Sequence, residues 1–190
     1  MVDESKVPAY VLPDALRSEL VHELMDARRA VLRPVIPNGV SPSDFSPSPL
    51  PSREGRIPIL LYIGTLADWQ GLEVLIHALP KILERQAVRL HIVGRGRSRQ
   101  RKQLSKQIRK LGLEECVVVL PAIPHHEIPA LISDSDICLA PLGLNDRNVT
   151  QGACPIKVLE YMASSRPLVA SNMPIVRELV REDVDGLLFS

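Results

Sequence analysis

The chain has 190 residues and a formal net charge of +1, because 23 lysines and arginines stand against 22 aspartates and glutamates. This balance excludes a strong global field that would attract nucleic acid or an anionic membrane. A hydrophobic content of 45% is that of an ordinary globular protein, and the length predicts one well-buried domain.

The cysteines and the hydropathy pattern indicate a cellular location. Cys116, Cys138 and Cys154 form no metal-spaced pair, and their odd number is typical of reduced thiols. The charges of Asp3 and Glu4 do not fit a signal peptide, and no window reaches the ~20 apolar residues of a membrane-spanning helix. We therefore expect a cytoplasmic protein, with peripheral membrane contact as an option that nothing in the sequence supports.

The N-terminal part of the chain predicts a helix followed by a connector. Apolar residues recur at helical spacing over residues 14–32, with Asp14 as the N-cap. Seven prolines then fall between Arg33 and Ile59, which predicts a flexible or extended connector. The expected division is a helix or hinge remnant at residues 1–34, a connector at 35–58 and a folded domain at 59–190.

After the connector, apolar β-rich runs alternate with amphipathic helical patterns. The expected strands are 59–63, 88–93, 117–120, 137–140 and 168–170, and the expected helices are 72–83, 98–111, 127–133, 156–164 and 175–182. This order predicts an α/β fold with a Rossmann-like, doubly wound parallel sheet, whose ligands bind at the carboxyl ends of the strands. The apolar run 187–190 suits a last strand without a following helix, so we expect a chain truncated at its ends.

The most informative segment begins at Pro155. Proline fits the first turn of a helix, and the amides of Ile156, Lys157 and Val158 would then point outward unpaired. Such a helix start attracts anions. Lys157 adds a charge in the first turn, and Glu160 lies one turn further on the same face, where it can accept hydrogen bonds from sugar hydroxyls. The implied ligand is a diphosphate joined to a ribose.

Two of these patterns also have simpler explanations. Lys157 and Glu160 could form an i, i+3 pair on a solvent-facing helix. The turn from Gly94 to Gly96 resembles part of a dinucleotide fingerprint, but Arg99 occupies the third glycine position, which favours a plain tight turn.

Other candidate sites are disfavoured by their context. The basic run over residues 95–110 lacks the interleaved aromatic residues that stack on bases, so it favours a solvated helix face over a nucleic-acid or lipid-headgroup patch. His125 and His126 are neighbours on a predicted loop without a third ligand nearby, so no metal site is expected.

Short motifs follow one another in a fixed order between residues 36 and 188. They are Ile36–Val40, Tyr62–Leu66, Leu90–Gly94, Pro121–Ile123, Asp136–Pro141, Lys157–Ala163, Arg166–Ser171 and Asp185–Leu188. In order and spacing the motifs resemble the carboxyl-terminal, nucleotide-sugar-binding half of GT-B glycosyltransferases of the group 1, glycogen-synthase-like superfamily. The resemblance covers roughly residues 35–190.

The resemblance implies a nucleotide-diphosphate-sugar donor and no cofactor or metal. It implies transfer of a hexosyl group, with retention, to a glycan, lipid-linked or small-molecule acceptor. The acceptor would bind to a similar N-terminal domain that we expect this chain to lack, so the isolated chain would turn over little. In the family, the residue matching Glu160 holds the ribose, the helix start holds the diphosphate, and the loop matching Pro121–Ile123 lies against the base. Lys157 is the candidate for the charge that stabilises the departing diphosphate. The expected donor-site residues are Gly64, Thr65, Gln70, Ala122, Ile123, Pro155, Ile156, Lys157, Val158 and Glu160, with Lys157 and Glu160 as catalytic residues.

Three positions depart from the family pattern. Gly152 stands where the family has a glutamate that touches the donor sugar, and Thr65 and Gln70 stand where it has an arginine and a lysine. Neutral side chains cannot replace two charges on a diphosphate. Arg95 and Arg147 are the candidates to compensate. The alternative hypothesis is a non-catalytic nucleotide-binding or interaction module derived from this family.

Overall fold

The structure, a computed structural model, describes residues 38–52, 54–149 and 154–190. The predicted helix at residues 14–32, the family position Gly152 and the side chain of Arg147 lie outside this description.

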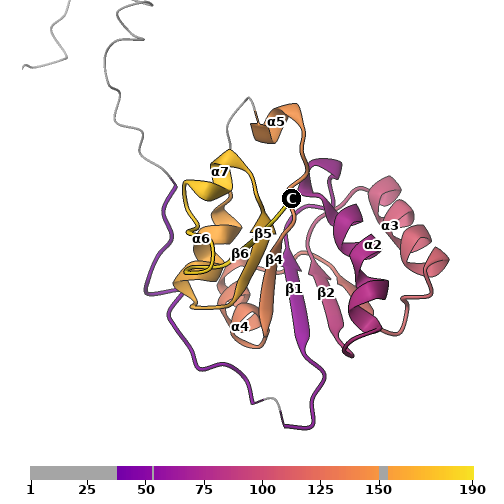
Figure 1. Cartoon of the computed structure of the whole chain (residues 1–190), viewed down its shortest axis with the longest axis horizontal. Coiled ribbons are helices and arrows are strands. Elements are labelled where there is room, and N and C mark those ends of the chain that lie inside the picture. Colours follow the sequence, from indigo (N-terminus) through magenta and orange to yellow (C-terminus); the bar gives the residue numbers. More distant parts are fainter. Residues whose placement is uncertain (1–37, 53, 150–153) are drawn as a thin grey trace, which may run out of the picture. The chain divides into compact units, whose positions relative to one another are not determined.

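Six parallel strands form one sheet (Figure 1). The strands are β1 (Ile59–Ile63), β2 (Arg89–Val93), β3 (Val117–Leu120), β4 (Ile137–Ala140), β5 (Leu168–Ser171) and β6 (Leu187–Phe189). Their order in the sheet is β3-β2-β1-β4-β5-β6, and every neighbouring pair is parallel. This is the Rossmann strand order. Strands β1 to β3 are added toward one edge of the sheet and β4 to β6 toward the other, so the predicted fold class is confirmed.

The helices are η2 (Asp68–Gln70), α2 (Leu72–Leu83), α3 (Ser98–Lys110), η3 (His125–Glu127), α4 (Ile128–Ser133), α5 (Asp146–Val149), α6 (Ile156–Ala163) and α7 (Pro174–Arg177). The first four predicted helices lie within one residue of their expected bounds, whereas α7 is shorter than expected and the short elements η2, η3 and α5 were not predicted. In the described part of the chain, no helix is long and apolar enough to cross a membrane.

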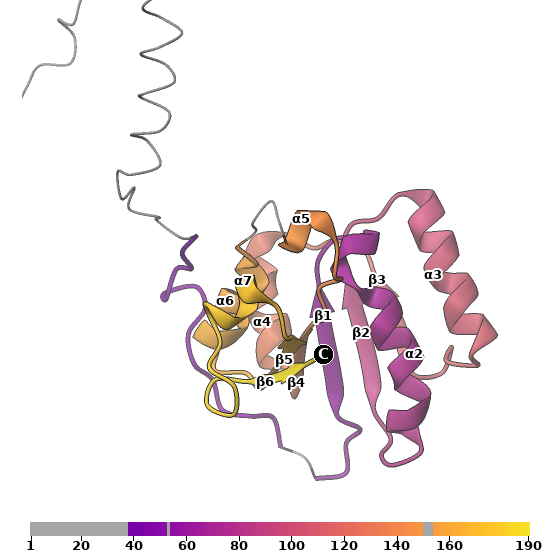
Figure 2. The same ribbon diagram turned by 45° about the horizontal axis from the view of Figure 1, so that its top comes forward.

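The core has two halves because side chains alternate across the strands. In β1, Leu60 and Tyr62 pack toward α2 and α3, whereas Leu61 and Ile63 pack toward α4, α6 and α7. Figure 2 shows α2 and α3 on one side of the sheet and α4 and α6 on the other. Both faces of β1 are therefore buried, as the continuous apolar run predicted.

The described part of the connector packs against the domain. The Phe45 side chain is only 2% exposed and belongs to the core on the α4 and α6 face. The Arg166 guanidinium donates hydrogen bonds to the Ser48 hydroxyl and to the Pro49 carbonyl, the latter at 2.9 Å. From Asn38 onward, the chain forms one compact unit.

The predicted helix 175–182 is wrong in its length, because α7 ends at Arg177. Residues 178 and 179 form a turn, and Val180 after it is buried. The backbone N–H of Arg181 then donates to the Asp185 carboxylate at 3.0 Å, and its guanidinium donates to both carboxylate oxygens at 2.7 Å. This closed loop, with Asp183 in the left-handed region at φ 61°, replaces the expected last helical turns.

Candidate functional site

The loops after β1 and β2 are fastened together at the carboxyl edge of the sheet. The Gly64 N–H donates to the Val93 carbonyl at 2.9 Å, and the Leu66 N–H donates to the Arg95 carbonyl at 2.8 Å. A Cβ atom at Gly94 would lie 1.7 Å from the carbonyl oxygen of Gly64. Glycine at position 94 is therefore required for this close approach, a more specific role than the plain turn that the sequence predicted.

Lys157, on the first turn of α6, reaches this edge directly beside Gly64. Its Nζ donates a hydrogen bond to Oε1 of Gln70 at 2.5 Å and lies 4.3 Å from the centroid of the Tyr62 ring. A Cβ atom at Gly64 would come within 2.6 Å of the same nitrogen. The Tyr62 hydroxyl donates to the Thr65 carbonyl at 2.8 Å. The structure thus brings together four of the predicted donor-site residues, Gly64, Thr65, Gln70 and Lys157.

The Lys157 ammonium lies in a poorly solvated place. Burial lowers the pKa of Lys157 to about 7, and the nearby charge of Glu160 opposes this effect. A buried cation without a full counter-charge loses its proton more easily. Near neutral pH, the group can therefore take up a proton when an anion arrives.

Glu160 is buried and has a partner that sequence reasoning missed. Its side chain is 8% exposed, and its Oε1 lies 3.0 Å from Nε2 of His125, which precedes α4. The His125 ring packs edge-on against Phe45, with centroids 5.5 Å apart. One oxygen of the Glu160 carboxylate is thus engaged by protein, and His125 belongs to the site through this contact.

The start of α6 differs in detail from the expectation. Pro155 is the N-cap and Ile156 the first helical residue. The Val158 N–H donates to the Pro155 carbonyl at 2.9 Å, a tight bond that is common in first turns and that removes Val158 from the predicted set of unpaired amides. No other described residue accepts a hydrogen bond from the amides of Ile156 and Lys157.

α6 is also tied to β1 one turn after Lys157, on the same face of the helix. The fully buried Tyr161 accepts a hydrogen bond on its hydroxyl from the Ile63 N–H at 2.9 Å. This bond, one residue before Gly64, fixes the height of the helix start relative to the carboxyl end of β1.

A cavity of about 280 Å³ opens at the carboxyl ends of β1, β2 and β3. It is lined by Ile63, Gly64, Thr65, Val93, Gly94, Arg95, Ala122, Ile123 and Ile128. Its walls are mainly apolar, which suits a planar base, and Arg95 supplies a charge at its rim. Four predicted donor-site residues line this cavity. Lys157 and Glu160 do not line it, although Lys157 adjoins it at Gly64.

Comparison with known proteins identifies related sequences. The family model described as "Glycosyl transferases group 1" matches residues 57–190. The phosphatidyl-myo-inositol mannosyltransferase of Mycobacterium leprae is 31% identical over 156 residues, which cover 80% of this chain and 39% of that protein. The chain therefore spans well under half the length of this curated relative.

Solved structures share the fold. The Anabaena protein HepE, in complex with UDP and glucose, superposes with a TM-score of 0.67 at 23% identity, over 80% of this chain and 42% of that one. The C-terminal domain of LpcC, a group 1 family glycosyl transferase of Francisella tularensis, gives a TM-score of 0.62 at 20% identity and covers 80% of both chains. At these identities the likeness concerns the fold alone.

Proposed function

The chain belongs to the group 1 glycosyltransferases, as a domain of their C-terminal type, and on this premise we propose that it binds the sugar donor. The proposed reaction of the whole protein is transfer of a hexosyl group from a nucleotide-diphosphate sugar, with retention and without a metal. The acceptor would bind to a further domain, so the 190 residues alone would bind donor and turn over little.

Each part of the donor has a proposed partner. The amides of Ile156 and Lys157, together with the Lys157 ammonium, would hold the diphosphate and stabilise it as it departs. The second carboxylate oxygen of Glu160 would accept hydrogen bonds from the ribose hydroxyls. The cavity beside Ala122 and Ile123 would receive the base.

The observation that carries this proposal is the position of the Lys157 Nζ. It is held at the carboxyl end of β1 by an amide oxygen and an aromatic face, neither of which is an anion. It lies beside a cavity of about 280 Å³ and one helical turn from the buried carboxylate of Glu160. A diphosphate would supply the counter-charge that this ammonium lacks.

The position of Arg95 suits a residue that compensates for the two charges missing at Thr65 and Gln70. Its backbone carbonyl is fixed to Leu66, and the residue lies at the cavity rim, one position from Gly94. We propose that its guanidinium replaces one of the two clamp charges that the family usually has near the first strand.

Calorimetric titration with uridine, guanosine and adenosine diphosphates, and with their sugars, tests the proposal. One base series should bind, and Lys157→Ala should weaken its binding about ten- to hundredfold, because a charge-assisted hydrogen bond is worth about 1.5–3 kcal/mol. Lys106→Ala removes an equal charge from the exposed face of α3 and serves as the matched control.

Two outcomes would decide against donor binding. Absence of binding by every nucleotide would contradict it, and so would equal affinities of wild type, Lys157→Ala and Lys106→Ala. Binding by the domain, together with no sugar transfer by the whole protein, would instead favour the non-catalytic nucleotide-binding module.

A further inference from the structure

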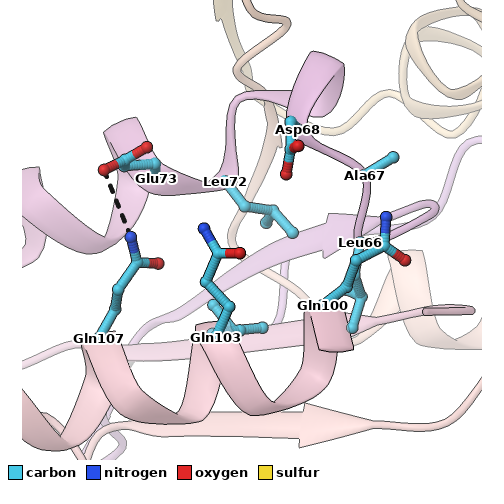
Figure 3. Close-up of a pocket in the computed structure, with 9 residues that line it drawn as sticks. Leu66, Ala67, Asp68, Leu72, Glu73, Gln100, Gln103 and Gln107 are labelled. Atoms are coloured by element: carbon cyan, nitrogen blue, oxygen red, sulfur yellow. Dashed lines mark hydrogen bonds between the residues drawn. The ribbon is translucent and has the colours of Figure 1, made fainter. Parts of the chain in front are cut away.

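A second, polar cleft of about 280 Å³ lies between α2 and α3 and shares no lining residue with the first cavity (Figure 3). Three glutamines of α3, Gln100, Gln103 and Gln107, line one wall, because their spacing of three and four residues places them on one helix face. Asp68 and Glu73 lie on the opposite wall. Figure 3 shows the three amides directed toward this wall.

The glutamine amides leave both donors and acceptors available. Among the described residues, Gln100 has one side-chain hydrogen bond, which its Oε1 accepts from the Arg97 N–H at 2.9 Å. Gln107 likewise has one within this part of the chain, in which its Nε2 donates to Oε1 of Glu73 at 3.3 Å. The Gln103 amide, between them, makes no hydrogen bond with any other described residue. Donors and acceptors therefore alternate along about two helical turns.

The charges of the cleft select against an anionic ligand. Its lining in the described chain carries two carboxylates, Asp68 and Glu73, and no lysine or arginine. A phosphate group would be repelled, so the cleft does not suit a second nucleotide. The described residues also contain no group of three or more His, Cys, Asp or Glu that could hold a metal ion.

Three leucines, Leu66, Leu72 and Leu104, also line the cleft. A sugar ring combines hydroxyl groups, each of which donates and accepts hydrogen bonds, with apolar C–H faces. A lining that combines amides and carboxylates with leucine side chains matches both features.

We propose that this cleft binds a neutral sugar unit. The site shares no lining residue with the donor site, because α3, the amino end of α2 and the segment 66–68 form it without Lys157 or Glu160. The ligand is either a free monosaccharide or one sugar of a longer glycan, and both present the same ring chemistry to the three amides.

Nuclear magnetic resonance of the ¹⁵N-labelled chain tests the site, because glutamine side-chain amides give their own signals. The probes are D-glucose, D-mannose and maltotriose. We expect the signals of Gln100, Gln103 and Gln107 to shift in a saturable way, and Gln103→Ala to weaken the binding about fivefold, as expected for the loss of one or two hydrogen bonds. Gln86→Ala, an exposed substitution beyond the other end of α2, should change nothing.

The probes also separate the sources of the sugar. Tighter binding of maltotriose than of glucose would indicate a glycan chain, and equal binding a free monosaccharide. The proposal is overturned if no sugar shifts these signals, if glycerol shifts them as strongly as glucose, or if inorganic phosphate shifts them instead. Gln103→Ala should leave nucleoside diphosphate binding unchanged, so failure of this site and failure of the donor site are distinguishable.

Discussion

Lys157 and Gln70 are 87 positions apart in the sequence, yet they share a hydrogen bond at the point where β1 ends. The family resemblance predicts a cation at position 70, and here the neutral Gln70 oxygen accepts from the lysine. The ammonium is thus positioned but not neutralised. Such a group changes its protonation when its surroundings change, which makes Lys157 measurable by its pH behaviour.

The pH dependence of the free energy of unfolding should show the lowered pKa of Lys157. Its pKa is about 7 in the folded chain and is raised to the ordinary lysine value on unfolding. Between these values the unfolded state binds more protons, so the free energy of unfolding should rise with pH from about 7 upward. Lys157→Met should lack this rise.

Denaturant titrations at pH 6.5, 7.5 and 8.5 measure the effect as the difference between wild type and Lys157→Met. The difference is needed because burial raises the pKa values of Cys138 and Tyr62, whose contributions have the opposite sign at higher pH and are shared by both proteins. An unchanged difference across this range would contradict a lowered pKa for Lys157.

The role of Glu160 can be tested by comparing the affinities of ribose and 2′-deoxyribose nucleotides. If its free oxygen accepts from the ribose hydroxyls, 2′-deoxy nucleoside diphosphate should bind the wild type about tenfold more weakly than the ribose form. Glu160→Gln keeps the shape of the side chain and should abolish most of this preference. Calorimetry of both ligands with both proteins gives the coupling directly, and a preference that survives Glu160→Gln would exclude contact with the ribose.

At the scale of elements, glycines set the distances between the loops at the carboxyl edge. Gly71 joins η2 to α2 in the left-handed region, at φ 68°, and a Cβ atom there would lie 1.8 Å from the Pro141 carbonyl oxygen. Gly71 directly follows Gln70, so this packing also determines where the amide that holds Lys157 lies.

A matched pair of substitutions separates close approach from backbone strain. Gly112 has nearly the same φ, 65°, but nothing lies within 4 Å of its Cβ position. Gly112→Ala should therefore cost about 1 kcal/mol of stability from φ alone. Gly71→Ala should cost about 3 kcal/mol or more, because a backbone carbonyl must also move. Urea denaturation compares the two, and equal losses would show that the space around Gly71 is not tight.

Local sequence patterns predicted the elements well where a continuous apolar run or a helical apolar stripe marks the buried residues. β1, β3 and β4 have the predicted bounds, because each is a continuous apolar run; β1 and β4 are mostly buried, and the edge strand β3 is partly buried. α2 likewise follows its apolar stripe from Leu72 to Leu83. The predicted bounds of helix 175–182 were wrong because the side chain of Asp185 accepts hydrogen bonds from Arg181. These bonds form a loop that competes with the last turns of the predicted helix.

The site was predictable only in part, for a different physical reason. The anion-binding character of the α6 start and the acceptor role of Glu160 depend on residues a few positions apart, and the sequence indicates them. The His125 contact with Glu160 joins positions 35 residues apart, and the Lys157 contact with Gln70 depends on how α6 stands against β1. Such contacts follow from the packing of α6 against η2 and η3, which no local pattern encodes.

At the scale of the whole molecule, the connector contributes to the stability of the domain. Phe45 fills the core beside α4 and α6 and supports the His125 ring. Phe45→Ala should reduce the free energy of unfolding by about 3 kcal/mol, because it leaves a cavity. Leu50→Ala, at a side chain that is 49% exposed, should change it by less than about 0.5 kcal/mol. Thermal unfolding of both variants checks this, and a Phe45→Ala loss as small as that of Leu50→Ala would place the connector outside the folded unit.

The hydrogen bonds that join the loops after β1 and β2, and the bond from α6 to β1, form the edge at which a diphosphate would meet Lys157. A crystal structure of the chain with the best-binding nucleoside diphosphate tests this position. We expect a phosphate oxygen within about 2.7–3.1 Å of the Lys157 Nζ and of the amides of Ile156 and Lys157, with the ribose against Glu160. A nucleotide ordered elsewhere on the domain, with the Lys157 bond to Gln70 intact, would contradict it.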